Sequence, residues 1–198
     1  QILLSKGQSE QVITYLANRT TFMKDTGYPS LEIKKILGQA YFATNAFASA
    51  LPLLETYIAS ADSFSRSDLY ELSYSQFRLG KWSDAITGFK KLTTLHDTIA
   101  AYAFFHLGES YVQLNNKQEA RSAYFLCKQN AIDRSLQSRA QFSFSKLSYE
   151  LDFSPYNEAV KGLQKYLNDY PNSQRKEECY NILTNVYSST KNYEQAIE

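Results

Sequence analysis

The chain has 198 residues, and its 21 Lys and Arg against 20 Asp and Glu leave a formal net charge of +1. No block of five like charges occurs, which argues against a basic stripe for nucleic acid or an anionic membrane. Sixteen Tyr and twelve Phe provide enough apolar surface for a packed core, so the chain is predicted to fold.

A degenerate repeat of about 35 residues runs along the whole chain. Self-similarity at this period predicts stacked helix pairs in which each pair packs on its neighbours, and not one closed globule. The repeated phrases are LGQAYFATNAFASALPLL from Leu37, LSYSQFRLGKWSDAITGF from Leu72, LGESYVQLNNKQEARSAY from Leu107, LSYELDFSPYNEAVKGL from Leu147 and LTNVYSSTKNYEQAIE from Leu183.

Each full copy is predicted to form two amphipathic helices joined by a short polar turn. In the third copy Phe104, Leu107 and Tyr111 follow the helical spacing of a first apolar face, and Ala120 and Tyr124 mark a second. The predicted order is a partial repeat at 1–30, full repeats at about 31–65, 66–100, 101–140 and 141–176, and a partial repeat at 177–198.

Small residues recur where two helices are expected to cross closely. The second helices are predicted to begin near Ala50, Ala85, Ala120 and Ala159. The matching small positions of the first helices are Gly38, Ser73, Gly108, Ser148 and Thr184.

Both ends of the chain are predicted to fall inside a repeat, which implies a longer natural protein. Gly7 and Val12 occupy the places that Gly80 and Ala85 have in a full repeat, and Tyr193 and Ala196 begin another second helix. An incomplete array leaves apolar faces uncovered, so we expect self-association through the ends. The residues of this expected face are Tyr180, Leu183, Tyr187 and Ile197.

The third copy carries the family pattern most fully, with Phe104, Leu107-Gly108, Tyr111, Ala120 and Tyr124 in the expected order. On these residues the chain resembles the tetratricopeptide repeat (TPR) family. The resemblance implies an all-α, right-handed superhelical α-solenoid of antiparallel helix pairs. It also implies a non-enzymatic scaffold that binds a protein or peptide partner.

A Tyr-Pro turn in the segment 166–173, YLNDYPNS, ends a predicted helix, because proline disfavours helical backbone in the residue before it. The phrase resembles the YLxxYPxS pattern of bacterial cell-envelope TPR proteins, such as YbgF-like proteins and accessory lipoproteins of outer-membrane assembly. This resemblance favours a bacterial periplasm or cell envelope over the cytoplasm.

In the TPR family the first helices line a concave face, and the resemblance assigns partner contacts to positions along it. Rigid aromatic side chains at such positions suit a groove for an extended or helical peptide. The alternative is that several of them pack between neighbouring first helices as core. The predicted contact residues are Gln39, Phe42, Tyr70, Tyr74, Phe77, Tyr102, Phe105, Glu109 and Tyr149.

The family's clamp for carboxylate-ended chaperone tails is not matched. It requires basic and amide side chains in three successive repeats, and this chain offers Lys35 with Gln39, then Glu71, then Tyr102 with His106. The negative charge of Glu71 would repel a carboxylate.

The sequence contains no nucleophile elbow, phosphate loop, HExxH helix or dinucleotide fingerprint. His96 and His106 lack a cluster of further ligands, and Cys127 and Cys179 lie in different repeats without a CxxC, so no metal, cofactor or disulfide is predicted. Cys127 is expected to be a buried, inert thiol. Two alternatives to the scaffold stay open: a regulatory or substrate-recruiting segment of a larger enzyme or sensor, and a glycan-binding envelope module.

Overall fold

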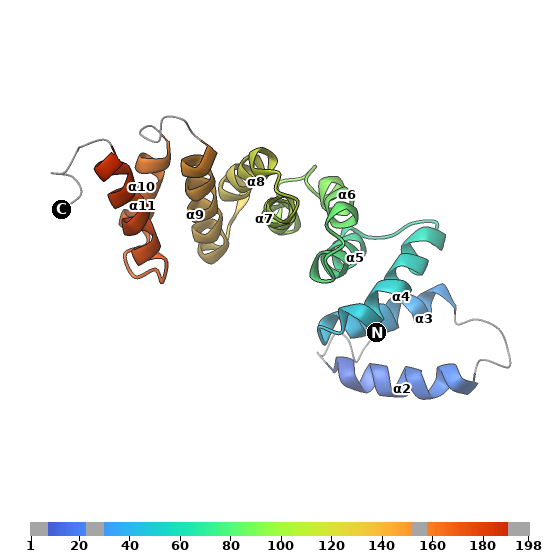
Figure 1. Ribbon diagram of the computed structural model, residues 1–198. Helices are drawn as coiled ribbons and strands as arrows, with labels where there is room; N and C mark the ends of the chain where they lie inside the picture. Colours follow the sequence, from blue (N-terminus) through green and yellow to red (C-terminus); the bar gives the residue numbers. More distant parts are fainter. Residues whose placement is uncertain (1–7, 23–29, 152–157, 190–198) are drawn as a thin grey trace. The chain divides into compact units, whose positions relative to one another are not determined.

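A computed structural model describes residues 8–22, 30–151 and 158–189, and every regular element within them is a helix (Figure 1). The predicted all-α class is therefore confirmed for this part of the chain. The helices are α2 (Ser9–Phe22), α3 (Leu31–Ala43), α4 (Phe47–Ser60), α5 (Arg66–Arg78), α6 (Trp82–Leu92), α7 (Thr98–Gln113), α8 (Lys117–Asn130), α9 (Arg134–Leu151), α10 (Ala159–Asp169) and α11 (Lys176–Ser189).

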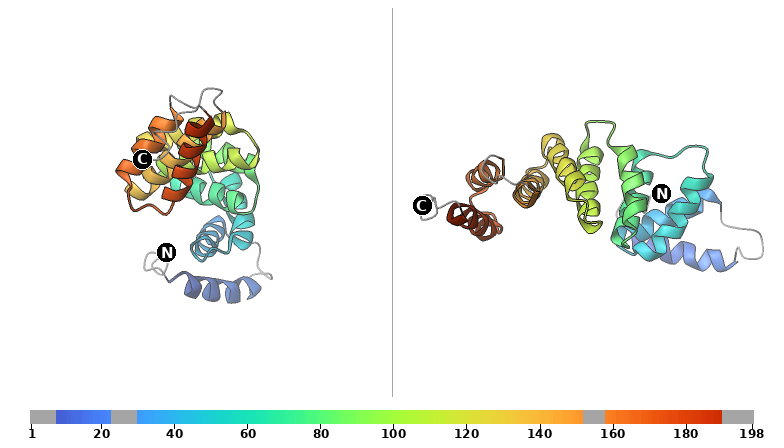
Figure 2. Two further views of the ribbon diagram at one scale, coloured as in Figure 1. Left: turned by 60° about the vertical axis from the view of Figure 1, so that its left-hand side comes forward. Right: turned by 45° about the horizontal axis from the view of Figure 1, so that its top comes forward.

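The helices fall into two compact units, Gln1–Leu95 and His96–Glu198. Within the first unit α3 packs on α4 and α5 packs on α6, and within the second α7, α8, α9 and α10 pack in succession (Figure 2). Contacts therefore form mainly between helices that are neighbours in sequence, as stacked helix pairs require.

Polar side chains cap the N-terminal ends of the first helices, because they accept hydrogen bonds from backbone amides that have no partner within the helix. Ser65 Oγ accepts from the amide of Asp68 at 3.1 Å, and Asp68 Oδ2 accepts from the amide of Ser65 at 2.9 Å, a reciprocal capping box. Asp97 Oδ1 likewise accepts from the amide of Ala100 at 2.8 Å at the start of α7.

The same type of turn joins the two helices in three of the helix pairs. Asn45, Gly80 and Asn115 follow α3, α5 and α7 at intervals of 35 residues and have φ of 59°, 76° and 56°. Glycine and asparagine tolerate this left-handed backbone best. In each turn the next amide also bonds back across the helix end, for example Ala46 N to Tyr41 O at 2.9 Å, which completes a Schellman motif.

The predicted close crossings are confirmed, since Ala50, Ala85, Ala120 and Ala159 are all 0% exposed. The first three lie three residues inside α4, α6 and α8, and the fourth begins α10. Glycines show how near the helices approach. A Cβ on Gly108 of α7 would lie 2.6 Å from Cε1 of Tyr124 in α8, closer than atoms can pack.

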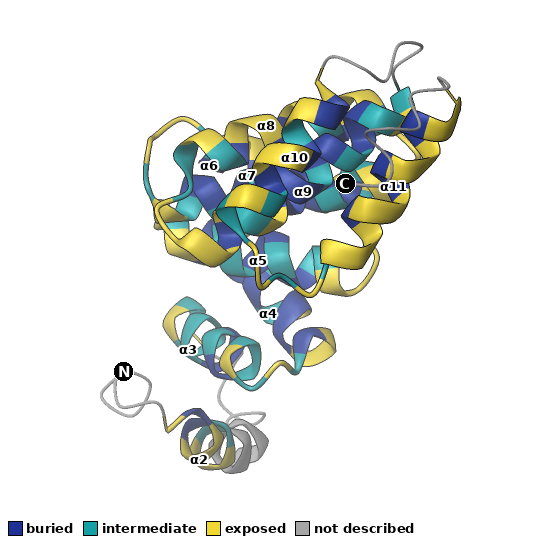
Figure 3. Ribbon diagram, turned by 90° about the vertical axis from the view of Figure 1, so that its left-hand side faces the viewer, coloured by how far each residue is buried: buried dark blue, intermediate teal, exposed yellow. Residues whose placement is uncertain are grey.

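Buried residues form stripes where helices face each other (Figure 3). In the first unit Ala50, Leu51 and Leu54 of α4 pack with Leu72 of α5. The second unit has two larger clusters. One joins α7, α8 and α9 around Phe105, Tyr124 and Phe144, and the other joins α9, α10 and α11 around Phe142, Tyr166 and Val186.

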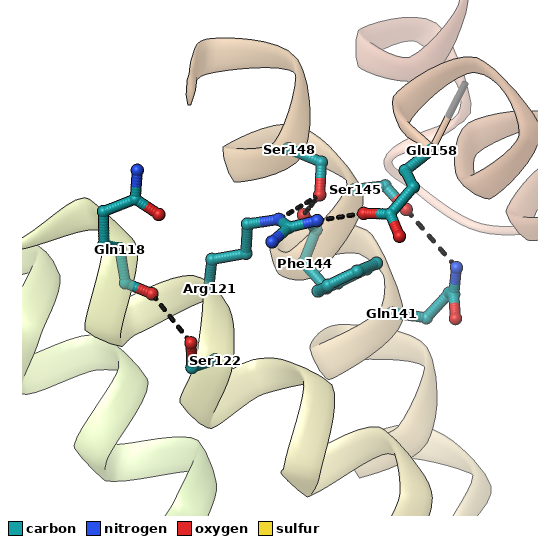
Figure 4. A network of polar contacts seen from close by, with 8 residues as sticks. All are labelled: Gln118, Arg121, Ser122, Gln141, Phe144, Ser145, Ser148 and Glu158. Atoms are coloured by element: carbon teal, nitrogen blue, oxygen red, sulfur yellow. Dashed lines mark hydrogen bonds and ion pairs between the residues drawn. The ribbon is translucent and has the colours of Figure 1, made fainter. Parts of the chain in front are cut away.

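A polar bracket fastens α8 to the next helix pair (Figure 4). Arg121 Nε donates to Ser148 Oγ at 2.7 Å, and the same guanidinium pairs with Glu158 and lies 4.9 Å from the ring centre of Phe144. One arginine thus connects α8 to α9 and to the residue that precedes α10.

Several predicted positions at the chain ends lie outside the described residues, namely Gly7, Tyr193, Ala196 and Ile197. Within α2, Val12 is buried, and α2 packs on α3. Tyr180 is exposed as expected, but the expectation of an uncovered face was wrong for Leu183 and Tyr187, because both are buried in the α9–α11 cluster.

The close crossing at Ala120 yields the first prediction. Ala120→Leu adds three carbons at a fully buried position, and overpacking of this kind costs about 1–3 kcal/mol, so the melting temperature followed by circular dichroism should fall. Ala48→Leu, at an exposed position of α4, is the control and should change little. An unchanged melting temperature for Ala120→Leu would contradict the crossing geometry.

Candidate functional site

The first unit presents a continuous face along α3 and α5, which we call the α3–α5 face. We refer to its polar side chains as the polar half and to its rings, including Phe47 at the start of α4, as the aromatic half. The polar residues are Lys35, Gln39, Asp68 and Glu71, and the aromatic residues are Phe42, Phe47, Tyr70, Tyr74 and Phe77.

Asp68 organises the polar half. Its carboxylate, 2% exposed, lies 3.1 Å from Lys35 Nζ and accepts a hydrogen bond from Gln39 Nε2 at 3.0 Å, while it also caps α5. Burial would raise the pKa of Asp68, but the hydrogen bonds from Ser65 and the ammonium of Lys35 outweigh it and hold the pKa below its ordinary value. The residue therefore stays charged and ties α3 to α5.

Glu71, one helical turn after Asp68, is in a much less favourable position. Burial, together with the negative charge of Asp68, raises its pKa to about 7, against weaker opposing effects of Gln39 and Lys35. Its Oε2 is buried and has no hydrogen-bond partner in the part of the chain that the structure describes. A buried acceptor without a donor is energetically costly.

The aromatic half is a connected series of rings. Phe42 of α3 meets Tyr74 of α5 edge to face at 5.8 Å, and Tyr74 stacks on Tyr70 at 5.9 Å and contacts Phe77 at 5.8 Å. Phe47 of α4 closes one side at 5.7 Å from Tyr74. These spacings are those of favourable aromatic pairs. Except for buried Phe47, these rings are half-buried, so each both packs and stays accessible.

The guanidinium of Arg78 braces the same rings. It lies 4.7 Å from the ring centre of Phe47, and its NH1 donates to the Tyr74 hydroxyl at 3.3 Å. A cation over a ring adds attraction and restricts the motion of both side chains.

In the second unit the predicted contact residues separate into different environments. Phe105 is 3% exposed and packs against Tyr124 at 5.5 Å, beneath the guanidinium of Arg139 at 4.2 Å. Tyr102 is half-buried and stacks on His106, whose Nδ1 lies 2.8 Å from Glu109 Oε2.

Tyr149 lies apart from these residues and packs, half-buried, against the α9–α11 cluster. The structure therefore brings five of the nine predicted residues together on the α3–α5 face, namely Gln39, Phe42, Tyr70, Tyr74 and Phe77. In the second unit Tyr102 and Glu109 share a contact with His106, and Phe105 belongs to the core. Partner contact by any of the nine stays a prediction.

Sequence reasoning missed a cluster of three arginines in the second unit. Arg134, Arg139 and Arg175 line a pocket of about 750 Å³ between the start of α9, the end of α10 and the turn before α11. A signal existed, because Arg139 and Arg175 both stand eight residues before the leucine that anchors their repeat, Leu147 and Leu183.

The remaining reactive side chains show no arrangement for chemistry. Burial raises the pKa of the Cys127 thiol to about 12 and that of Cys179 to about 11, so both are protonated, and Cys127 is buried as predicted. Within residues 8–22, 30–151 and 158–189 no three His, Cys, Asp or Glu side chains gather as a metal site. In the same ranges no helix combines the length and apolarity needed to span a bilayer.

Comparisons with known proteins agree with this architecture. The sequence profile described as tetratricopeptide repeat matches residues 69–98, 102–124 and 147–173, so these three segments are similar to TPR repeats. No curated protein sequence matches the chain significantly.

Several solved structures resemble the chain. Their sequence identity to it is low, so the likeness shows a shared fold and no more. A crystal structure of MamA matches with a TM-score of 0.65 and 19% identity over 86% of this chain and 91% of that one. A putative kinesin light chain of P. anserina with TPR-like repeats matches with a TM-score of 0.59 and 17% identity over 87% and 92%. The quorum sensor NprR from B. thuringiensis matches with a TM-score of 0.59 and 13% identity over 94% of this chain and 56% of that one.

The environment of Glu71 yields the second prediction. Its folded-state pKa near 7 exceeds the unfolded value near 4.5, so the folded state loses stability as pH rises between these values. Glu71→Gln removes the buried charge and should therefore gain stability over the parent chain as pH increases from 5 to 8, measured as urea midpoints. The control Glu119→Gln, at an exposed position of α8, should show no such gain. The raised pKa of Glu71 would be refuted if the urea midpoint of Glu71→Gln, relative to that of the parent chain, stayed constant or fell as pH increased.

Proposed function

We propose that this chain is a non-enzymatic protein-interaction scaffold whose α3–α5 face binds a peptide segment of a protein partner. The observation that carries the proposal is the combination, on one face, of half-buried connected rings and a buried carboxylate oxygen without a donor. Rings held by neighbours lose little entropy on binding, and such residues dominate interface energies.

The two halves of the face define the chemistry of the peptide. The ring cluster suits an aliphatic or aromatic side chain, which would bury apolar area against Phe42 and Tyr74. Glu71 suits a Lys or Arg side chain placed nearby, because a positive charge would stabilise its carboxylate against burial and the charge of Asp68. We infer a segment with an apolar residue and a nearby basic residue.

The concave-face residues of the second unit extend the proposal. Tyr102, Glu109 and Tyr149 are partly exposed and offer partner contacts within the second unit, whereas Phe105 is buried beneath Arg139. The Tyr166–Ser173 phrase supports a bacterial cell-envelope location for such a scaffold.

A second candidate is a sensor segment. The likeness to the quorum sensor NprR covers 94% of this chain but 56% of that one, so a similar array exists inside a longer sensor. In that role the same face would bind the peptide and another part of the protein would respond.

The third prediction tests the α3–α5 face. A random peptide library displayed on phage should enrich, on the purified chain, sequences that pair an apolar residue with Lys or Arg. Tyr74→Ala should weaken binding of the selected peptide about 30-fold, since a central interface aromatic contributes about 2 kcal/mol. Affinity is measured by fluorescence anisotropy and helicity by circular dichroism.

The matched control is Phe64→Ala, which truncates an exposed aromatic of the same unit outside the ring cluster and should leave affinity within twofold. Full binding by Tyr74→Ala would place the peptide elsewhere. Loss of helicity in Tyr74→Ala would show that the rings serve only as core.

A further inference from the structure

The pocket in the second unit concentrates positive charge. The whole sequence holds seven arginines and a net charge of +1, yet three of the arginines, Arg134, Arg139 and Arg175, line this one pocket. Asp169 is the single acidic side chain among the lining residues, and its Oδ2 is already 3.0 Å from Lys165 Nζ. Asp133, just before α9, is occupied in bonds to the amides of Ser135 and Leu136. The pocket is therefore strongly positive for its surroundings.

Each guanidinium is held in place with hydrogen-bonding capacity to spare. Arg134 donates to the Asp169 carbonyl at 3.0 Å and faces the ring of Tyr170. Arg175 lies 4.7 Å from the ring centre of Phe142, and no carboxylate in the described residues pairs with it. A guanidinium has five N–H donors, so these contacts leave several free for a ligand.

Arg139 lies between an aromatic ring and a carboxylate of α7. Its guanidinium rests 4.2 Å from the ring centre of Phe105 and lies 3.7 Å from Glu109 Oε1, which is beyond a tight pair. The carboxylate of Glu109 is instead held by His106 at 2.8 Å. A ligand carboxylate at normal distance would therefore be a better partner for Arg139 than the one the protein supplies.

The floor of the pocket is rigid and polar. Tyr166 is 1% exposed, and its hydroxyl lies 2.6 Å from Ser173 Oγ and accepts from Ser138 Oγ at 3.2 Å. Ser173 also accepts from the amide of Arg175 at 3.2 Å, which fixes the turn that carries this arginine. A preorganised site of this kind loses little entropy when a ligand binds.

We propose that the three-arginine pocket binds an acidic peptide segment, in which closely spaced Asp or Glu carboxylates pair with Arg134, Arg139 and Arg175. Most rim residues, including Arg134, Arg139, Asn172 and Gln174, are exposed. An open rim cannot enclose a small molecule as deeply as metabolite sites do, whereas a peptide crosses it and inserts side chains. The proposal does not rest on the α3–α5 face, and either site can fail alone.

The test uses the whole chain and fluorescence anisotropy with a labelled eight-residue peptide containing Glu-Asp-Glu-Asp between glycines. The wild-type chain should bind it at least about tenfold tighter than the Gln-Asn-Gln-Asn peptide, and binding should weaken with salt. The double variant Arg139→Gln with Arg175→Gln should lose about tenfold or more in affinity. The double variant Lys91→Gln with Lys161→Gln removes the same charge from exposed positions outside the pocket and should bind within twofold of wild type.

A charge swap guards against a variant that merely unfolds. Arg175→Glu should lose affinity for the acidic peptide and gain affinity for a peptide that carries Lys-Lys in place of acidic residues. A variant that fails to fold cannot gain affinity in this way. Tyr74→Ala should bind the acidic peptide normally. Equal loss in the lysine control, tighter binding of a single-stranded oligonucleotide of equal charge, or failure of the charge swap would each overturn the proposal.

Discussion

The rest of the structure depends on how closely the two helices of each pair approach. Ala120 is fully buried, and Gly108 leaves no room for a Cβ against the ring of Tyr124. Where the first helix carries Ser73, the second carries Gly88, and a Cβ there would meet Ser73 Oγ at 2.0 Å. Small residues at each crossing keep the axes near enough that larger side chains interlock on both sides. The first helices are thereby held close enough to share a face.

Because of this packing, Asp68 acts both as a helix cap within α5 and as a link between α5 and α3. The same carboxylate that caps α5 accepts from Gln39 and pairs with Lys35 on α3. A capping residue alone acts within its own helix, but burial between two helices strengthens its charge interactions. The consequence for Glu71 is unfavourable, because the negative charge of Asp68 adds to burial in raising its pKa. The contacts of Asp68 that join α3 to α5 therefore place the carboxylate of Glu71, beside the ring cluster, in an unfavourable environment.

The helix pairs, the alanine crossings and the burial of Cys127 were predictable, since each follows from a spacing visible in the sequence. The state of Phe105 was not. Helical spacing places it on the same face as Tyr102, but Tyr124 and Arg139 cover it, and those residues come from α8 and α9. The arginine pocket was harder still, because its lining joins Arg134 to Arg175 through the Tyr170–Pro171 turn. Residue spacing in the sequence identifies which side chains share one face of a helix. It does not show which side chains of other helices cover that face or meet on it.

A net charge of +1 conceals two candidate sites of opposite character. Among the described residues, the α3–α5 face has a buried carboxylate oxygen without a donor, and the pocket in the second unit has guanidiniums with unused N–H donors. With little overall field, long-range steering of a partner is weak, so selection must come from charges that meet at contact distance. Because each helix pair packs mainly on its neighbours, substitutions at one site disturb the other little. Each candidate site depends on a few side chains of adjacent helices within its own unit.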